Sequence, residues 1–228
     1  MKPGFIGDPD TYLGAKLKKV MLDNGVSCWG MSPSKYIRES INNVEVYLRD
    51  KSLPKLKTKV RGHWPTDYVS ELDVTPELDP VRAQYYQSQI GVLHWIVELG
   101  RIDIITEVSK LASFMALPRE GHLEAIFHIF AYLRRRHNSR MVFDPCYPDM
   151  DMSKFKTDVD WTEFYGDMEE PLPRDAPAPR GKCVDMRLFC DADFAGDKKT
   201  RRSRSGYIIY INNAPTAWLS KKKIYSRD

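Results

Sequence analysis

The spacing of apolar residues changes along this chain, and this change constrains the fold more than any other feature of the sequence. Between residues 81 and 136, apolar side chains recur every three or four positions, which is typical of amphipathic helices. From residue 184 they alternate with polar residues, as in Val184 to Cys190, which is typical of β-strands. Because the two periods occupy separate segments, the sequence predicts an α+β fold.

Three helices are predicted in the central part, over residues 81–99, from Asp103 to Pro118, and over 119–136. Gly100 suits the C-terminal cap of the first helix, and Asp103 suits the N-cap of the second. His122 is expected to cap or to pack near the start of the third. The apolar spacing predicts these buried positions: Tyr85, Ile90, Leu93, Val97, Ile104, Val108, Leu111, Ala112, Met115, Leu123, Ile126, Phe127, Phe130 and Leu133.

The N-terminal part is predicted to form a hairpin over residues 12–31, followed by a helix. Asp23-Asn24-Gly25 is a strong turn signal, because Asn and Gly accept the positive φ of a tight hairpin. Ser32 before Pro33 suggests an N-cap and a first-turn proline. The apolar face of the following helix is expected to comprise Ile37, Ile41, Val44 and Leu48.

The C-terminal part is predicted to be an antiparallel meander of three strands, at residues 184–190, 207–211 and 216–220. Two other segments show no regular period. Residues 51–80 are basic and rich in proline, which predicts a linker or a long surface loop. Residues 144–180 are acidic and rich in proline, which predicts an insertion that ends at a domain boundary.

Three blocks near the C-terminus carry a resemblance to a known family. Residues 190–197 read C-D-A-D-F-A-G-D, residues 200–207 read T-R-R-S-R-S-G-Y, and residues 218–223 read W-L-S-K-K-K. In this order and spacing, they resemble the start of the RNase H domain in copia-type LTR retrotransposon polyproteins. Residues 85–93, Y-Y-Q-S-Q-I-G-V-L, are similar to the connection region that follows the reverse transcriptase of that family.

The resemblance implies a β-hairpin with a thumb-like helix, a helical connection region and an incomplete RNase H-like antiparallel sheet. It also implies five segments: 1–50 as the end of the reverse transcriptase palm and thumb, 51–80 as a linker, 81–143 as the helical connection region, 144–180 as the acidic insertion, and 181–228 as the N-terminal part of the RNase H-like domain. The chain is thus expected to be a fragment of a retrotransposon polyprotein, with the rest of that polyprotein as a partner.

Asp191 matches the first catalytic acid of the family, which implies a catalytic and metal-binding role. RNase H chemistry uses paired divalent metals held by several carboxylates, and Mg²⁺ suits such ligands. In the family, the other RNase H acids would follow Asp228, and the polymerase Asp pair would precede Met1. We therefore expect a chain that is inactive alone and binds Mg²⁺ weakly. Without the motif, Asp191 would simply be a turn residue at a strand end.

A cluster of basic residues is the candidate contact with the phosphates of an RNA/DNA hybrid. Lys and Arg that neutralise phosphates give binding that depends on salt and not on sequence. The alternative is a solvated face, since the net charge is only +4. Trp218 is expected in the core rather than as a base-stacking platform. The candidate phosphate contacts are Arg201, Arg202, Arg204, Lys221, Lys222 and Lys223.

Several classes of protein are excluded, and two alternatives stay open. The four cysteines form no C-x-x-C pair, so we expect no zinc knuckle but reduced thiols in an intracellular protein. No apolar run of about 18 residues exists, so no membrane span is expected. One alternative is a non-catalytic nucleic-acid-binding module. Another is a nonfunctional relic, because Phe194 and Arg204 depart from the family pattern of Trp and Thr.

Overall fold

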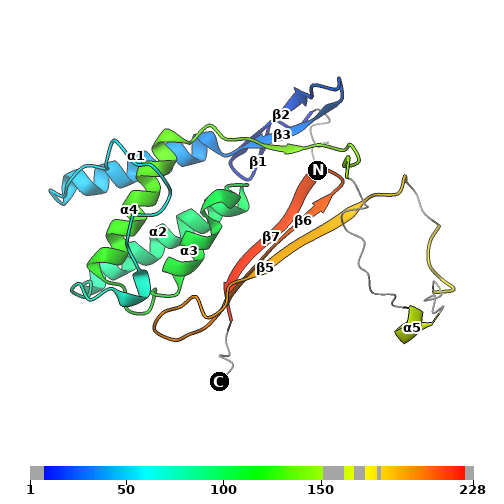
Figure 1. The fold of residues 1–228 in the computed structure, drawn as a ribbon. Helices are drawn as coiled ribbons and strands as arrows, with labels where there is room; N and C mark the ends of the chain where they lie inside the picture. The colour runs from blue at the N-terminus through cyan, green and yellow to red at the C-terminus, as the bar shows by residue number, and fades with distance from the viewer. Residues whose placement is uncertain (1–7, 151–161, 167–172, 179–180, 224–228) are drawn as a thin grey trace.

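The structure is a computed structural model that describes residues 8–150, 162–166, 173–178 and 181–223. Helices α1 to α4 form a helical unit, and two antiparallel sheets lie beside it (Figure 1). The predicted α+β class is therefore confirmed. The helices are α1 (Ser34–Asp50), α2 (Pro80–Glu98), α3 (Ile105–Ala112), α4 (Glu120–Arg135) and α5 (Thr162–Tyr165), with 3-10 turns η1 (Ser70–Leu72) and η2 (Ile102–Ile104).

The strands lie before α1 and after α4. They are β1 (Thr11–Tyr12), β2 (Ala15–Met21), β3 (Ser27–Ser32), β4 (Met141–Phe143), β5 (Met186–Ala192), β6 (Arg204–Ile211) and β7 (Ala214–Lys222). The first sheet has the order β1-β2-β3-β4, and the second has the order β5-β6-β7. The second sheet is the predicted three-stranded meander.

The apolar faces of α1 to α4 form the main core, and most of the predicted buried positions are in it. Four predicted positions are not fully buried: Tyr85, Ala112 and Phe127 are partly buried, and Met115 is exposed. Tyr86 is fully buried where Tyr85 was expected, and its hydroxyl donates to the Leu111 carbonyl at 2.7 Å. Tyr85 is only half-buried, and its ring stacks on Tyr47 at a centroid distance of 3.5 Å. Met115 is 39% exposed, since α3 ends before it.

The ends of α2 follow the rules for helix caps. Asp79 is the N-cap, and its carboxylate accepts from the backbone N–H groups of Val81 and Arg82 at 2.9 and 3.0 Å. At the other end Gly100 has φ +101°, and its N–H bonds to the Val97 carbonyl at 2.9 Å. Arg101 N–H bonds back to Ile96 at 3.2 Å, which completes a Schellman motif. The predicted cap at Gly100 is confirmed.

Two other predicted caps are wrong. Ser32 ends β3, and its hydroxyl donates to the Ser139 carbonyl at 3.0 Å instead of capping α1. Asp103 lies inside η2, where its carboxylate accepts two hydrogen bonds from the buried guanidinium of Arg101. Ser139 is distant from Ser32 in the sequence, whereas Arg101 lies only two positions before Asp103, and each partner binds the side chain in place of a helix cap. His122 does cap and pack as predicted: its Nδ1 accepts from Arg119 N–H at 3.0 Å, and its ring stacks on Phe114.

The predicted hairpin forms between β2 and β3. Gly25 has φ +80°, and the side-chain Oδ1 of Asn24 accepts from Val26 N–H at 3.0 Å, which is the hydrogen bond of an Asx turn. The sequence did not predict β4. This strand follows α4 in the chain and pairs with β3 in the register Trp29↔Phe143. This pairing ties the N-terminal hairpin to the end of the helical unit.

The irregular segment 51–80 is anchored on the helices. Leu56 and Val60 are buried in the main core. Arg134 donates to the Leu56 and Lys57 carbonyls, and Arg135 donates to the Val60 carbonyl. The domain boundaries predicted at residues 50, 80, 143 and 180 stay predictions. Much of the predicted acidic insertion, at 151–161, 167–172 and 179–180, lies outside the described residues.

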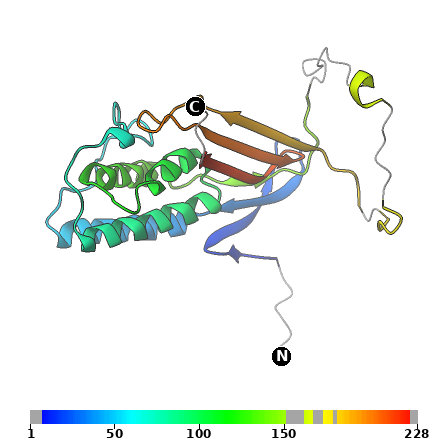
Figure 2. The same ribbon diagram turned by 90° about the horizontal axis from the view of Figure 1, so that it is seen from below.

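Trp218 on β7 links the second sheet to the rest of the molecule. Its ring packs against the main helical core and also against a smaller cluster around Ala15, Met31, Leu99 and Met141. The predicted core role of Trp218 is therefore confirmed. Strand β7 lies next to α3, and β5 lies on the far side of the sheet (Figures 1 and 2). The helices thus support one edge of the meander.

The sequence predicted reduced thiols and no membrane span. All four cysteines are free. Within the described ranges, no helix has the length and apolar character that crossing a membrane would need.

Gly100→Ala tests the cap of α2. The substitution should lower the free energy of unfolding by about 1–2 kcal/mol, because alanine is strained at positive φ. In addition, its Cβ would lie 3.0 Å from Cε of Met141. The matched control is Gly91→Ala inside α2, where an added Cβ meets nothing within 4 Å. The control should raise stability by about 0.5–1 kcal/mol in urea unfolding, and equal effects of the two would contradict the cap.

Candidate nucleic-acid interface

The register of β6 and β7 brings the six predicted basic residues to one end of the second sheet. Arg204 at the start of β6 is paired with Lys222 at the end of β7. The backbone N–H of Lys223 extends this pairing by donating to the Ser203 carbonyl at 2.8 Å. Arg201 and Arg202 precede β6 in the loop that follows β5. Two segments about 20 positions apart therefore form one basic cluster, which comprises Arg201, Arg202, Arg204, Lys221, Lys222 and Lys223.

Ser109 of α3 holds this end of the sheet on the helical unit. Its hydroxyl donates to the Ser220 carbonyl on β7 at 2.6 Å. The same oxygen accepts from Nη1 of Arg204 on β6 at 2.5 Å. One half-buried side chain thus joins two neighbouring strands to a helix that lies about 100 positions earlier in the sequence.

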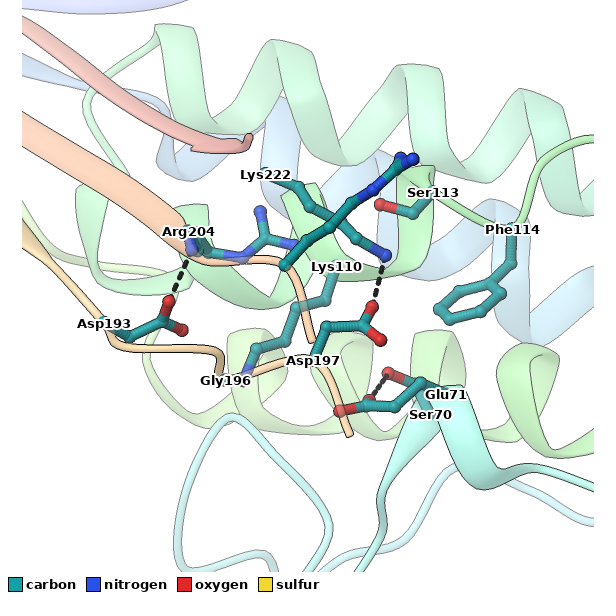
Figure 3. A pocket seen from close by; sticks show the side chains of 11 residues that line it. Ser70, Glu71, Lys110, Ser113, Phe114, Asp193, Gly196, Asp197, Arg204 and Lys222 are labelled. Atoms are coloured by element: carbon teal, nitrogen blue, oxygen red, sulfur yellow. Dashed lines mark hydrogen bonds and ion pairs between the residues drawn. The ribbon is translucent and has the colours of Figure 1, made fainter. Parts of the chain in front are cut away.

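Two of the six basic residues are engaged by acids. Lys222 forms an ion pair with Asp197, whose side chain is 12% exposed. The backbone N–H of Arg204 donates to the carboxylate of Asp193, in the loop before β6, at 2.5 Å. Partial burial lowers the pKa of the Arg204 guanidinium, while Asp193 and Asp197 act in the opposite direction. Figure 3 shows these side chains around a small pocket of about 70 Å³.

The Asp197 carboxylate organises the loop between β5 and β6. It accepts from the backbone N–H groups of Lys199 and Thr200 at 3.1 and 2.7 Å, in addition to its contact with Lys222. Partial burial raises the pKa of Asp197, but the hydrogen bonds from Lys222 and Thr200 outweigh it and lower the pKa to about 2. The carboxylate is therefore ionised at neutral pH and fixes the loop that carries Arg201 and Arg202.

The other four basic residues face solvent. Arg201, Arg202, Lys221 and Lys223 are exposed. They lie around the engaged pair, and Arg202 lines the same pocket as Asp193 and Asp197. Within the described part of the chain, none of the four forms an ion pair with an acid. An exposed group of this kind can contact a phosphate backbone at little desolvation cost.

The sequence did not reveal the contribution of the helices to this site. Lys110 of α3 lines the same pocket, with its ammonium 5.7 Å from the centre of the Trp64 ring. Glu71 of η1 also lines it and accepts from the backbone N–H of Lys198 at 3.2 Å. Neither residue belongs to a recognisable motif, and both are distant in the sequence from the basic cluster. Only the tertiary fold brings them there.

Asp191 lies on β5 near the basic cluster, opposite Gly206 of β6. Its carboxylate is exposed and accepts from the backbone N–H of Ala192 at 2.8 Å. It lines one side of an open cleft of about 460 Å³ between the second sheet and α3. The other acid in the cleft, Asp193, is bound to Arg204 N–H.

The described residues around Asp191 do not fit a site for paired Mg²⁺ ions. Such a site needs several carboxylates that converge on the metals. In the part of the chain that the structure describes, no group of three or more His, Cys, Asp or Glu side chains is placed to hold a metal ion. Asp193 and Asp197 are occupied by internal hydrogen bonds, so Asp191 stands without such a set.

Comparisons with known proteins give distant relatives. No protein-family model matches the chain, and no solved structure is similar to it. The chain is 26% identical over 159 residues to the retrovirus-related Pol polyprotein from transposon RE1 of Arabidopsis thaliana, over 70% of this chain and 8% of that protein. It is 23% identical over 216 residues to the Pol polyprotein from transposon TNT 1-94 of Nicotiana tabacum, over 95% of this chain and 13% of that protein.

A third relative is shorter. The chain is 25% identical over 138 residues to the secreted RxLR effector protein 161 of Plasmopara viticola, over 60% of this chain and 72% of that protein. Two of these three relatives are Pol polyproteins of transposons, and the chain spans only 8% and 13% of their length. The similarities support a segment of a retrotransposon polyprotein.

The ion pair of Asp197 predicts how stability depends on pH. The pKa of Asp197 is about 2 in the folded protein, below the value of about 3.9 in an unfolded chain. Its stabilising effect is therefore complete above about pH 4 and is lost as the pH falls toward 2. Asp197→Asn should lower the free energy of unfolding by about 1 kcal/mol at neutral pH, and this difference should shrink on acidification.

The control for this prediction is Lys222→Ala, read by NMR titration of the Asp197 carboxyl carbon. Removal of the ammonium should move the pKa of Asp197 up toward its ordinary value, because the hydrogen bond from Lys222 to the carboxylate disappears. An unchanged titration would show that the ion pair does not hold the loop.

Proposed function

We propose that this chain is part of the reverse transcriptase/RNase H region of a copia-type retrotransposon polyprotein, and that it binds nucleic acid through the basic cluster without catalysing a reaction alone. One observation carries the proposal. The three motif blocks become neighbours in the meander: Asp191 lies opposite Gly206, and Arg204 lies opposite Lys222. The blocks that resemble the RNase H start thus form one end of a single sheet.

The arrangement of charges supports binding through the phosphate backbone. Asp197 and Glu71 hold the loop and Lys222 in place, while the four exposed cations surround this fixed centre. Basic residues on a preorganised loop lose little side-chain and backbone entropy when they bind a phosphate. The proposed ligand is an RNA/DNA hybrid, and the proposed protein partner is the rest of the polyprotein. An intracellular location follows from these partners.

The position of Asp191 supports an inactive chain. Hydrolysis of a phosphodiester with two metals needs more carboxylates than the one exposed acid at the end of β5. The two acids that follow it serve the loop instead. In this proposal Asp191 descends from a catalytic residue, and the chain on its own retains binding but not cleavage.

Binding is tested with a fluorescently labelled RNA/DNA hybrid. Anisotropy should show an affinity that falls linearly with salt on a logarithmic scale, because binding releases counterions from phosphates. Arg201→Ala together with Arg202→Ala should weaken binding by roughly tenfold and reduce the salt slope by about 2, if each arginine contacts one phosphate.

The matched control is Lys35→Ala together with Arg38→Ala, two exposed cations on α1. This pair removes the same charge far from the cluster, so it should leave the salt slope unchanged. If both double variants weaken binding equally, the effect comes from net charge and the proposed interface is wrong.

Cleavage is tested with the same hybrid in the presence of Mg²⁺. The native chain should release no more product than Asp191→Asn, while both bind the hybrid equally. Mg²⁺-dependent cutting that Asp191→Asn abolishes would refute the inactive chain. Binding without cleavage also favours the second candidate, a non-catalytic nucleic-acid-binding module derived from a retroelement, for which the four exposed cations are sufficient.

A further inference from the structure

We propose that a cavity in the helical unit is a binding site for a small aromatic acid, whose ring fills the apolar part of the cavity and whose carboxylate or phosphate binds Lys55 and Lys57. The proposal goes beyond nucleic-acid binding and does not rest on it. It depends on the size and lining of the cavity, on its aromatic wall, and on the two lysines, which have no acidic partner among the described residues.

The cavity lies between α1, α2, α4 and the start of the irregular segment 51–80. Helix α1 begins directly after β3, and α4 leads to β4, so the end of α1 and the start of α4 lie away from the first sheet (Figure 1). All the residues that line the cavity fall between positions 48 and 128. The second sheet therefore contributes nothing to the cavity, which also shares no residue with the basic cluster.

The apolar part of the cavity has room for a small molecule. The cavity has a volume of about 400 Å³, and small-molecule sites have volumes of roughly 300–1,000 Å³. The apolar lining residues are Leu48, Leu53, Pro54, Leu56 and Phe127. An apolar lining with a few polar groups is the usual composition of such sites.

The segment that covers the cavity is fixed on the helices. Leu56 is buried in the main core, and Leu53 N–H donates to the Leu48 carbonyl at the end of α1 at 2.8 Å. The guanidinium of Arg134 on α4 donates to the carbonyls of Leu56 and Lys57 at 3.2 and 2.9 Å. The cavity is therefore preformed, so a ligand loses little affinity to the ordering of this segment.

Phe127 of α4 makes one wall of the cavity aromatic. Its ring centroid lies 6.5 Å from those of Tyr47 and Tyr85, which stack on each other. The three rings pack as one group, which limits the rotation of Phe127. Because ring pairs gain energy beyond the burial of apolar area, a planar ring suits this wall better than an alkyl chain of the same size.

Lys55 and Lys57 supply positive charge to the lining. Both are exposed, and within the described ranges neither forms an ion pair with an acid. Burial lowers the pKa of His128, another lining residue, against the effect of its hydrogen bond to Gly62, and the charge of Lys57 lowers it further. The imidazole is therefore neutral at pH 7, and the two ammonium groups are the cations that an anionic ligand would meet.

The acids of the lining do not cancel this charge. Glu120 is bound by both Nη atoms of Arg82, so these two charges neutralise each other. Glu124 is exposed and is the one other acid that lines the cavity. Two lysines against one glutamate leave an excess of positive charge beside the apolar part. Complementary charge of this kind selects an anionic ligand over a neutral one of the same shape.

The experiment uses naphthoate and naphthyl phosphate, which share one ring system and differ in the anionic group. Neutral naphthamide and aliphatic decanoate are the comparison probes. Nitrogen–proton NMR spectra of the full chain should show saturable shifts of amides in 48–57 and 120–128. The better of the two acids should bind at least about fivefold more tightly than naphthamide, and it identifies the carboxylate or the phosphate as the preferred group.

Three outcomes of this titration would overturn the proposal. Shifts that do not saturate, or that are spread over the whole chain, would indicate nonspecific contact with apolar surface. Equal affinities for the acids and for naphthamide would remove the role of the lysines. Decanoate that binds as tightly as the naphthyl acids would show that the cavity does not select an aromatic ring.

Lys55→Gln together with Lys57→Gln tests the anionic subsite, with Lys51→Gln together with Lys59→Gln as the matched control. Lys51 and Lys59 are exposed on the same segment but do not line the cavity, so both pairs remove the same charge. The first pair should weaken binding of the acid by about five- to tenfold and leave the affinity for naphthamide unchanged. Equal losses in the two pairs would reduce the effect to net charge and refute the subsite.

The result is separable from that of the hybrid-binding experiment. Arg201→Ala together with Arg202→Ala should leave the affinity for the naphthyl acids unchanged, because neither arginine lines the cavity. Acid binding that this pair abolishes would place the acid on the basic cluster and overturn the proposed cavity site. A chain that binds the acid but no hybrid would contradict only the proposed function.

Discussion

One hydroxyl group ties both β6 and β7 to the helical unit. The Ser109 hydroxyl on α3 donates to Ser220 of β7 and accepts from Arg204 of β6. Each such hydrogen bond contributes only about 1 kcal/mol. Trp218 packs against both apolar clusters and adds apolar packing between the sheet and the helices. Apolar packing holds the sheet close, and Ser109 selects one orientation.

The electrostatics of the basic cluster follow from this placement. Because the sheet is fixed on α3, the loop after β5 reaches η1, where Lys198 N–H bonds to Glu71. Asp197 then holds Lys222, and the remaining cations stay at the surface. Two acids thus organise the loop without cancelling the charge that solvent and ligands meet. A cluster of six cations without these acids would repel itself and leave the loop poorly defined.

Much of the fold could be predicted from local signals. The Asn24-Gly25 turn, the cap at Gly100 and the alternation after residue 184 depend on interactions within a few positions, so the sequence shows them directly. The hydrophobic spacing gave most of the core, but a one-residue error between Tyr85 and Tyr86 arose because aromatic side chains fit both the core and its rim.

The rest of the fold and of the site depends on partners that are distant in the sequence. Strand β4 is three residues long and pairs across more than 100 positions, so no local pattern marks it. Ser32 has the side chain of a helix cap, yet its hydroxyl binds the carbonyl of Ser139, which lies 107 positions away. The motif blocks identified the cations of the site, whereas Ser109 and Lys110, which position and extend it, carry no signal of their own.

The most direct test of this account is native-state hydrogen exchange on Ser109→Ala, with Ser113→Ala as the matched control on the same helix. Ser113 is the C-cap of α3, and among the described residues its hydroxyl bonds only to the Ser109 carbonyl, so its loss should leave the sheet in place. We expect faster exchange of the β6 and β7 amides in Ser109→Ala alone. Equal protection of those amides in both variants would contradict the claim that Ser109 fixes the sheet on the helices.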